Sequence, residues 1–189
     1  MYQNLKTFTS RFINLTEEEA EELLSIFKPS PVKRLDHLFL EGEMIDKIYF
    51  INEGVLRGYY MREGKEYTTH FLFGPTIFTD ITSIRKKVPT LINFQALKAT
   101  DCLVAQFSDL EDLTNKSPNI EHIFFKFMEH LYLFGVMRQL SFIYDTPQER
   151  YIKLFSERPK VIAEIPQHYI ASYLGIKPES LSRIRKRIL

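Results

Sequence analysis

The chain has 189 residues, with 25 Lys and Arg against 24 Asp and Glu, which suits one generous domain or two small ones. Hydrophobic residues make up 44% and aromatic residues 14%, which excludes intrinsic disorder because a sizeable core can be buried. The single Cys102 cannot form an internal disulfide or supply the thiolates of an iron–sulfur cluster. No stretch approaches the roughly 20 apolar residues of a membrane span, so we expect a soluble, cytoplasmic protein.

The first predicted helix spans 17–27, because Thr16 and Glu19 have the spacing of a capping box. Five of the seven glycines then lie between Gly42 and Gly74, separated by short runs rich in β-branched and aromatic residues. These runs predict antiparallel strands at 47–51, 55–60 and 67–73, followed by a further strand pair at 91–97 and 102–107. We therefore expect a barrel or sandwich in this region.

Within residues 119–144 the apolar residues recur with the period of a helix. Apolar residues recur there at intervals of four, three, four and three, at Ile120, Phe124, Phe127, Leu131 and Phe134. Further apolar residues widen this surface, so the helix must be covered on more than one side. We expect the five residues, called here the predicted seam, to form a homodimer interface. A buried helix within a monomer is the alternative.

From Gln167 the sequence reads QHYIASYLGIKPESLSRIRKRIL and has the pattern of a helix-turn-helix. The core positions of such a hairpin are apolar here, at Ile170, Leu174, Ile176, Leu181 and Ile184. Ala171 is small enough for the two helices to cross closely, and Gly175 supplies the positive φ that a tight turn requires. Pro166 and Pro178 stand where the helices would begin. The pattern predicts a DNA-binding hairpin, with a purely structural one as the alternative.

The second helix of this hairpin would present its N-terminal half to the major groove. The side chains that would reach base edges are Glu179, Ser180 and Arg183. Arg can donate two parallel bonds to guanine and Glu can accept from the cytosine amine, which predicts a G·C-containing step. An ion pair between Glu179 and Arg183 within the helix is the alternative interpretation.

The distribution of charge also indicates that the C-terminal end of the chain binds nucleic acid. Five cations and one anion lie between Lys177 and Leu189, a net charge of +4 that leaves −3 for the rest. A basic element on an acidic body is typical of nucleic-acid binding, although a solvated helix end is also basic. We assign the cations outside the base-reading set to DNA phosphates: Lys177, Arg185, Lys186 and Arg187.

A glycine-punctuated barrel, a long apolar helix and this hairpin follow one another in the bacterial transcription regulators of the cyclic-AMP receptor and FNR family, which the chain resembles. Residues 39–54 resemble the opening hairpins of that family's β-roll, and 178–184 resemble its recognition helix. The resemblance implies an α+β fold with an antiparallel β-roll of the cupin-like, cyclic-nucleotide-binding type. It also implies a parallel homodimer that binds a pseudo-palindromic DNA operator and contacts RNA polymerase.

On this basis we expect three parts in the chain. Residues 1–115 would form an N-terminal helix and an effector-sensing roll, 116–145 the dimerisation helix, and 146–189 the helix-turn-helix domain. The wing hairpin that follows the recognition helix in this family is expected to be absent, since the chain ends at Leu189. That absence would remove some phosphate contacts.

The roll departs from the cyclic-nucleotide binders of that family. They place a Gly-Glu pair for the ribose and Arg-Ser or Arg-Thr for the phosphate, where this chain reads IFTDI at 77–81 and LINF at 91–94. Without a cation at Ile92 a cyclic phosphate would be buried with an unpaired charge, so we expect no cyclic AMP or GMP binding. A pocket for an unknown small-molecule effector would be lined by Phe78, Asp80 and Asn93. The cations at 85–87 offer an anion site or, alternatively, a solvated loop.

Two other function classes are alternatives to a regulator. An enzyme is not expected, because a cupin needs a cluster of His and Glu ligands, and the sequence has no Gly-rich phosphate loop or nucleophile elbow. The five histidines show no metal-ligand spacing, so we expect no metal and no cofactor. The remaining rival is a small-molecule-binding roll whose end domain has a structural or protein-contact role.

Overall fold

The computed structural model describes residues 2–188; Met1 and Leu189, the outer limits of the expected first and last parts, lie outside the described residues. The helices are α1 (Tyr2–Thr9), α2 (Glu17–Ser25), α3 (Ile81–Lys86), α4 (Phe107–Lys116), α5 (Pro118–Tyr144), α6 (Pro147–Glu157), α7 (Pro159–Glu164), α8 (Gln167–Leu174) and α9 (Pro178–Ile188). The strands are β1 (Lys28–Pro29), β2 (His37–Phe39), β3 (Lys47–Glu53), β4 (Val55–Arg62), β5 (Lys65–Phe73), β6 (Thr76–Phe78), β7 (Ile92–Ala96) and β8 (Asp101–Gln106).

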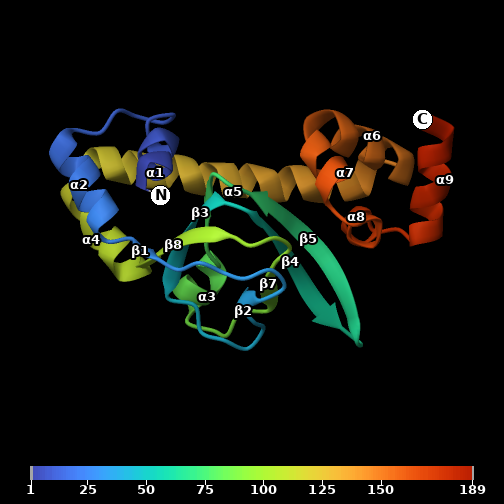
Figure 1. Cartoon of the computed structure of the whole chain (residues 1–189), viewed down its shortest axis with the longest axis horizontal. Helices are drawn as coiled ribbons and strands as arrows, with labels where there is room; N and C mark the ends of the chain where they lie inside the picture. The colour runs from blue at the N-terminus through green and yellow to red at the C-terminus, as the bar shows by residue number, and fades with distance from the viewer. Residues whose placement is uncertain (1, 189) are drawn as a thin grey trace.

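The strands form two antiparallel sheets, in the orders β1-β8-β3-β6 and β2-β7-β4-β5, which face each other as a β-roll (Figure 1). The predicted strands and the α+β fold class are therefore confirmed. The expected pairing of the last two strands is wrong, because β7 pairs with β2 and β4 whereas β8 pairs with β1 and β3. The segment between them crosses from one sheet to the other, where Thr100 bridges to Val32.

Helix α2 begins at the predicted capping box. The Glu19 amide donates to Thr16 Oγ1 at 3.2 Å, and the Thr16 amide donates to Glu19 Oε2 at 2.9 Å. The same carboxylate also accepts from Ser117 Oγ at 2.6 Å and from Asn119 Nδ2 at 3.1 Å, which joins the start of α5 to the start of α2. Phe27, beyond the end of α2, is 2% exposed and belongs to the core beneath these helices.

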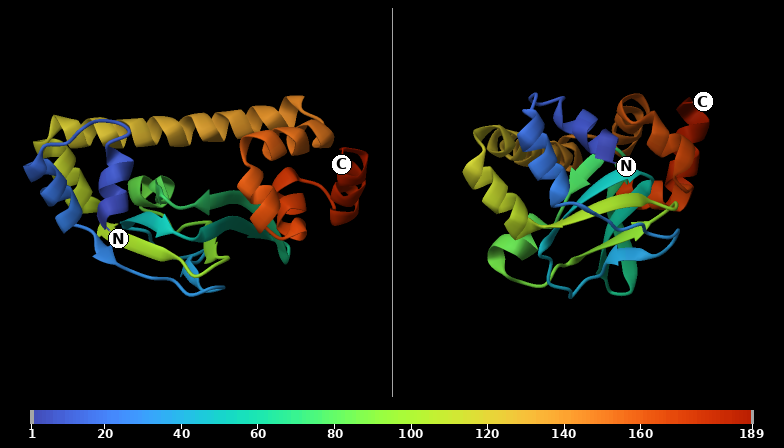
Figure 2. Two further views of the ribbon diagram at one scale, coloured as in Figure 1. Left: turned by 45° about the horizontal axis from the view of Figure 1, so that its top comes forward. Right: turned by 60° about the vertical axis from the view of Figure 1, so that its left-hand side comes forward.

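Helix α5 runs along the roll and reaches the C-terminal helices (Figures 1 and 2). Ser117 caps it and Pro118 occupies its first turn, so the predicted helix is confirmed. For Ile120 and Phe127, the expectation of a dimer interface is wrong. Ile120 and Phe127 are 1% and 5% exposed within the chain's own core, and the other three seam residues pack against that core or face the roll. A heptad spacing marks an apolar face but does not identify what covers it.

A different apolar surface of α5 is exposed to solvent. Its members, called here the exposed α5 face, are Tyr132, Leu133, Met137, Leu140, Ile143 and Tyr144. Four of them recur at intervals of four, three and four, so they lie along one side of the helix. Among the described residues, no helix is both long enough and apolar enough to cross a membrane.

Helices α6 to α9 surround a second hydrophobic core, to which the roll also contributes side chains. Tyr151, Val161 and Leu181 are each 1% exposed or less in this cluster, which also contains Val55 of β4 and Phe71 of β5. The helical unit and the roll are therefore packed on each other (Figure 2, left).

Candidate nucleic-acid interface

The hairpin α8–α9 has the geometry of a helix-turn-helix. Gly175 has a φ of +70° at the end of α8, and its amide donates to the carbonyls of Ala171 and Ser172. A Cβ at this position would lie 2.8 Å from Cε1 of Phe142, so the turn requires glycine for its conformation and for space. The predicted core residues of the hairpin are buried or pack against the buried cluster. The turn therefore fixes the orientation of α9 relative to α8.

The predicted base-reading residues lie on one side of α9. Glu179 and Arg183 are exposed and Ser180 is half-exposed. The guanidinium of Arg183 donates to Ser180 Oγ at 3.4 Å. Within residues 2–188 no ion pair joins Glu179 to Arg183, so their side chains present an acceptor and a donor separately.

The cations assigned to phosphates divide into two groups. Lys177, Lys186 and Arg187 are exposed, as a phosphate contact requires. Arg185 is half-buried, and its Nε is enclosed by protein with no hydrogen-bond partner among the described residues. A phosphate contact from Arg185 would therefore have to come from the terminal nitrogens of its guanidinium.

The first helix of the hairpin, α8, lies against strand β5 of the roll. Ser172 Oγ accepts from the Thr68 amide at 2.9 Å and donates to the Glu66 carbonyl at 3.1 Å. The ring of Tyr173 packs against that of Phe71 in a tilted arrangement, with ring centroids 5.1 Å apart. No local sequence pattern predicts these contacts, since about a hundred residues separate the partners.

A buried arginine stands at the centre of this contact. Arg57 is 1% exposed, donates to Thr68 Oγ1 at 2.8 Å and pairs with Glu66 at 2.7 Å. Its guanidinium also lies 4.3 Å from the Tyr59 ring centre and 3.8 Å from the Tyr169 ring centre. Arg57 is not among the site residues predicted from the sequence, although it is a charged residue inside the apolar run 55–60.

The inside of the roll is filled with aromatic side chains. Phe78 packs on Phe94 and Tyr49 at ring-centroid distances of 4.8 and 5.4 Å, and Phe39 lies 5.3 Å from Phe94. These four residues are called here the aromatic plug, and all are 6% exposed or less. The plug occupies the space between the two sheets.

The three predicted pocket residues have different roles. Phe78 belongs to the plug and also lines a cavity outside it. Asp80 caps α3 by accepting from the Thr82 and Ser83 amides, and it also borders that cavity. The assignment of Asn93 is wrong, because strand alternation turns it away from the cavity, where it bonds to Glu41 and Tyr59.

The nearby cations at 85–87 are not arranged as an anion site. Arg85 pairs with Glu111 and lies 5.0 Å from the Phe107 ring centre. Lys86 and Lys87 are exposed at the end of α3.

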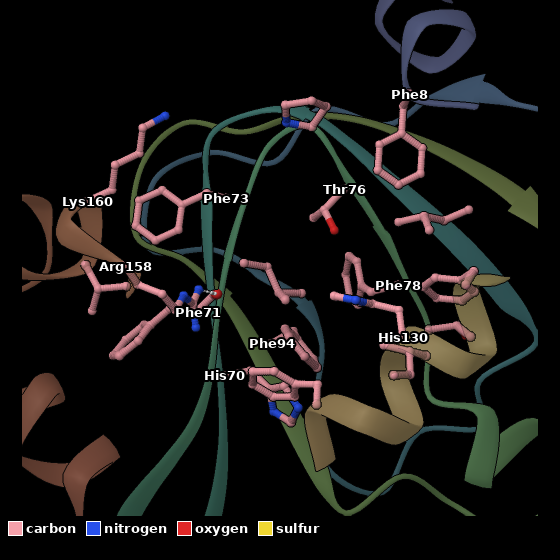
Figure 3. A pocket seen from close by; sticks show the side chains of 18 of the residues that line it. Phe8, His70, Phe71, Phe73, Thr76, Phe78, Phe94, His130, Arg158 and Lys160 are labelled. Atoms are coloured by element: carbon pink, nitrogen blue, oxygen red, sulfur yellow. Dashed lines mark hydrogen bonds between the residues drawn. The ribbon is translucent and has the colours of Figure 1, made fainter. Parts of the chain in front are cut away.

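A cavity of about 780 Å³ opens between the roll, α1, α5 and α7 (Figure 3). His70 of β5 stands in its wall, and burial, with Arg138 and Arg158 nearby, lowers the pKa of this imidazole to about 4. His70 is therefore neutral at pH 7.

Metal and thiol chemistry find little support in the described part of the chain. No group of three or more His, Cys, Asp or Glu side chains there is placed to hold a metal ion. Burial, together with Asp101, raises the pKa of the Cys102 thiol to about 12, so this thiol stays protonated.

Comparison with known proteins gives consistent results. Residues 30–117 match the family model of the cyclic nucleotide-binding domain. The anaerobic regulatory protein of Haemophilus influenzae is 28% identical over 92% of this chain and 72% of its own length. The regulatory protein HlyX of Actinobacillus pleuropneumoniae is 28% identical over 92% of this chain and 77% of its own. The structure of FixK2 from Bradyrhizobium japonicum superposes with a TM-score of 0.74 at 16% identity, covering 86% of this chain and 84% of that one.

Proposed function

Because the chain belongs to the Crp/Fnr family of transcription regulators, we propose that it binds a DNA operator as a homodimer and reads base edges with Glu179, Ser180 and Arg183. The observation that carries this proposal is the exposed face of α9 beyond the Gly175 turn, where these three side chains project together. Lys177, Lys186 and Arg187 flank this face and add affinity without sequence choice.

The dimer in this proposal forms through the exposed α5 face. Large apolar side chains such as Leu133 and Met137, 52% and 64% exposed, lie along one side of a helix 27 residues long. Pairing two such faces in parallel would bury them and bring two copies of α9 to the same side of the dimer. The operator would then have two half-sites about one helical turn, roughly 34 Å, apart.

The proposed regulator does not use cyclic AMP or cyclic GMP as its effector. The aromatic plug fills the inside of the roll. Ile92 and Asn93 are the residues expected from the sequence resemblance at the positions where the cyclic-nucleotide binders carry their phosphate ligands. A cyclic phosphate entering there would lose its hydration without gaining a cation.

The test is selection of bound sequences from a random duplex pool, at two salt concentrations. We expect a two-fold-symmetric motif. Arg183→Ala should relax the preference at one position of each half-site by about 1–3 kcal/mol. Lys186→Ala is the matched control, because a phosphate contact should weaken all sequences alike and lower the salt slope by about one unit.

The contrary outcome is weak, salt-sensitive binding with no motif in any of the three proteins. That result would favour the rival function, a small-molecule-binding roll whose helical end domain contacts protein. Recovery of a motif that Arg183→Ala leaves unchanged would reject the assigned base-reading residue while leaving DNA binding in place.

A further inference from the structure

The cavity of about 780 Å³ lies outside the aromatic plug and is bounded by both parts of the molecule. Strands β5 and β6 of the roll supply one side, α5 another, and the start of α7 in the helical unit closes one end. A volume of this size is within the range of small-molecule sites. A molecule bound there would contact the roll and the DNA-binding unit at once.

Most of the cavity wall is apolar. Phe8 of α1, Phe73 of β5, Ile77 of β6, and Leu131 and Phe134 of α5 all line it. Figure 3 shows Phe8 and Phe78 on one side of the space and Phe73 on the other. An apolar body is therefore the part of a ligand that this wall favours.

The charged groups of the cavity are distributed unevenly. His70, in the interior wall, is neutral at pH 7 because of burial. The Asp80 carboxylate already accepts from the Thr82 and Ser83 amides and from Thr90 Oγ1, the last at 2.6 Å. Away from the α7 end, the described lining carries no Lys or Arg, and His130 of α5 is its second imidazole.

Cations occur at the end formed by α7. Arg158 is half-buried and donates to the Phe71 carbonyl, and Lys160 is exposed beside Phe73 (Figure 3). Glu157 lines the same end and offsets one of the two charges. The α7 end therefore carries a net positive charge next to an apolar interior.

We propose that this cavity binds an amphipathic anion: a single carboxylate at Lys160 and Arg158, on an aliphatic body that extends toward Leu131 and Phe134. The carboxylate stays at the cationic rim and keeps part of its hydration, whereas the body is removed from water. Binding itself does not depend on DNA. The role of such a molecule as an effector rests on the proposed function, because the ligand spans the contact between the roll and the helix-turn-helix unit.

The experiment is calorimetric titration of the full chain with decanoate below its micellar concentration. The uncharged 1-decanol and the cationic decyltrimethylammonium ion are the comparison probes. We expect decanoate to bind at least fivefold more tightly than decanol, and the cationic probe to bind most weakly. Equal binding of all three would overturn the assignment of a carboxylate site, and no binding of decanoate would overturn the site altogether.

Three variants locate the site. Lys160→Glu should weaken decanoate binding about fivefold while leaving decanol unchanged, and Lys33→Glu, an exposed lysine that does not line the cavity, should leave both unchanged. Thr76→Trp should fill the cavity and abolish binding of both probes. Circular dichroism and melting temperature establish that each variant is folded, and a folded Thr76→Trp that binds decanoate normally would place the probe elsewhere.

DNA binding is measured separately on the same proteins. Failure to bind decanoate with operator binding intact rejects only the ligand site. Loss of operator binding with decanoate binding intact rejects only the proposed function. If both bind, the factor by which decanoate changes operator affinity must equal the factor by which the operator changes decanoate affinity.

Discussion

The guanidinium of Arg57, in the roll, lies 3.8 Å from the ring centre of Tyr169, in the first helix of the helix-turn-helix. The same guanidinium pairs with Glu66 at 2.7 Å. The positive charge of Arg57 is therefore compensated by a carboxylate of the roll itself, and the Tyr169 ring covers the paired guanidinium. A residue of the roll thus contacts the helix-turn-helix unit directly. Neighbouring bonds from Ser172 hold that unit in the same place.

Replacement of Arg57 by alanine should destabilise the protein by about 2 kcal/mol, because Glu66 loses its partner and Tyr169 loses the group beneath it. Arg62→Ala is the matched control on the same strand. The Arg62 side chain is 80% exposed, against 1% for Arg57, and its removal should cost less than about 0.5 kcal/mol. Urea denaturation followed by circular dichroism measures both values, and equal losses would contradict the role given to Arg57.

Gly175→Ala should destabilise the helix-turn-helix more than Gly64→Ala destabilises its hairpin. Both glycines have nearly the same positive φ, +70° and +72°, so both substitutions carry a strain of about 1 kcal/mol. Only at Gly175 does an added Cβ meet a neighbour, Phe142, at 2.8 Å. The difference between the two melting temperatures therefore measures that contact, and an equal decrease would show that Phe142 moves aside freely.

Met137→Glu should give a folded monomer, because it places a charge on the exposed α5 face. Phe127→Glu should instead unfold the N-terminal core, since it buries a carboxylate where the native side chain is 5% exposed. Sedimentation velocity gives the oligomeric state and circular dichroism the fold. A Met137→Glu protein that remains dimeric would rule out the exposed α5 face as the interface.

The Glu19 carboxylate should make stability depend on pH in the acid range. Hydrogen bonds from Ser117, Thr16 and Asn119 lower its pKa to about 2, below the value of about 4.3 in an unfolded chain. Its contribution is therefore fully present above about pH 5 and is lost as the pH falls toward 2.

Denaturation midpoints of the native protein and of Glu19→Gln, measured from pH 7 to pH 2, check this expectation. The gap between the two should be constant near neutrality and should shrink on acidification. A gap that is constant over the whole range would exclude the carboxylate as its source.

Local signals in the sequence predicted the elements well. The capping box at Thr16 and Glu19 and the positive φ of Gly175 depend on residues a few positions apart, and both are present as expected. Strand positions and the order of roll, long helix and helix-turn-helix also follow from local pattern.

Contacts between residues that are distant in the sequence could not be predicted. The spacing of Phe127 marks an apolar face equally well for a dimer or for the chain's own core, and the structure assigns it to the core. The expectation that Asn93 lines a pocket depends on the register of β7, and a shift of one residue reverses the side of the strand. The hydrogen bond of Ser172 to Thr68 joins two segments for which the sequence carries no common pattern.

Strand β5 lies at the edge of its sheet, and side chains of the helical unit occupy the backbone groups that a neighbouring strand would otherwise pair. Ser172 bonds to the Thr68 amide and the Glu66 carbonyl, Arg138 donates to the Thr68 carbonyl at 3.4 Å, and Arg158 donates to that of Phe71. An uncovered edge of this kind is a template for aggregation. The helical unit therefore also protects the roll from self-association, and a roll expressed without it should precipitate through β5 while the full chain stays dispersed.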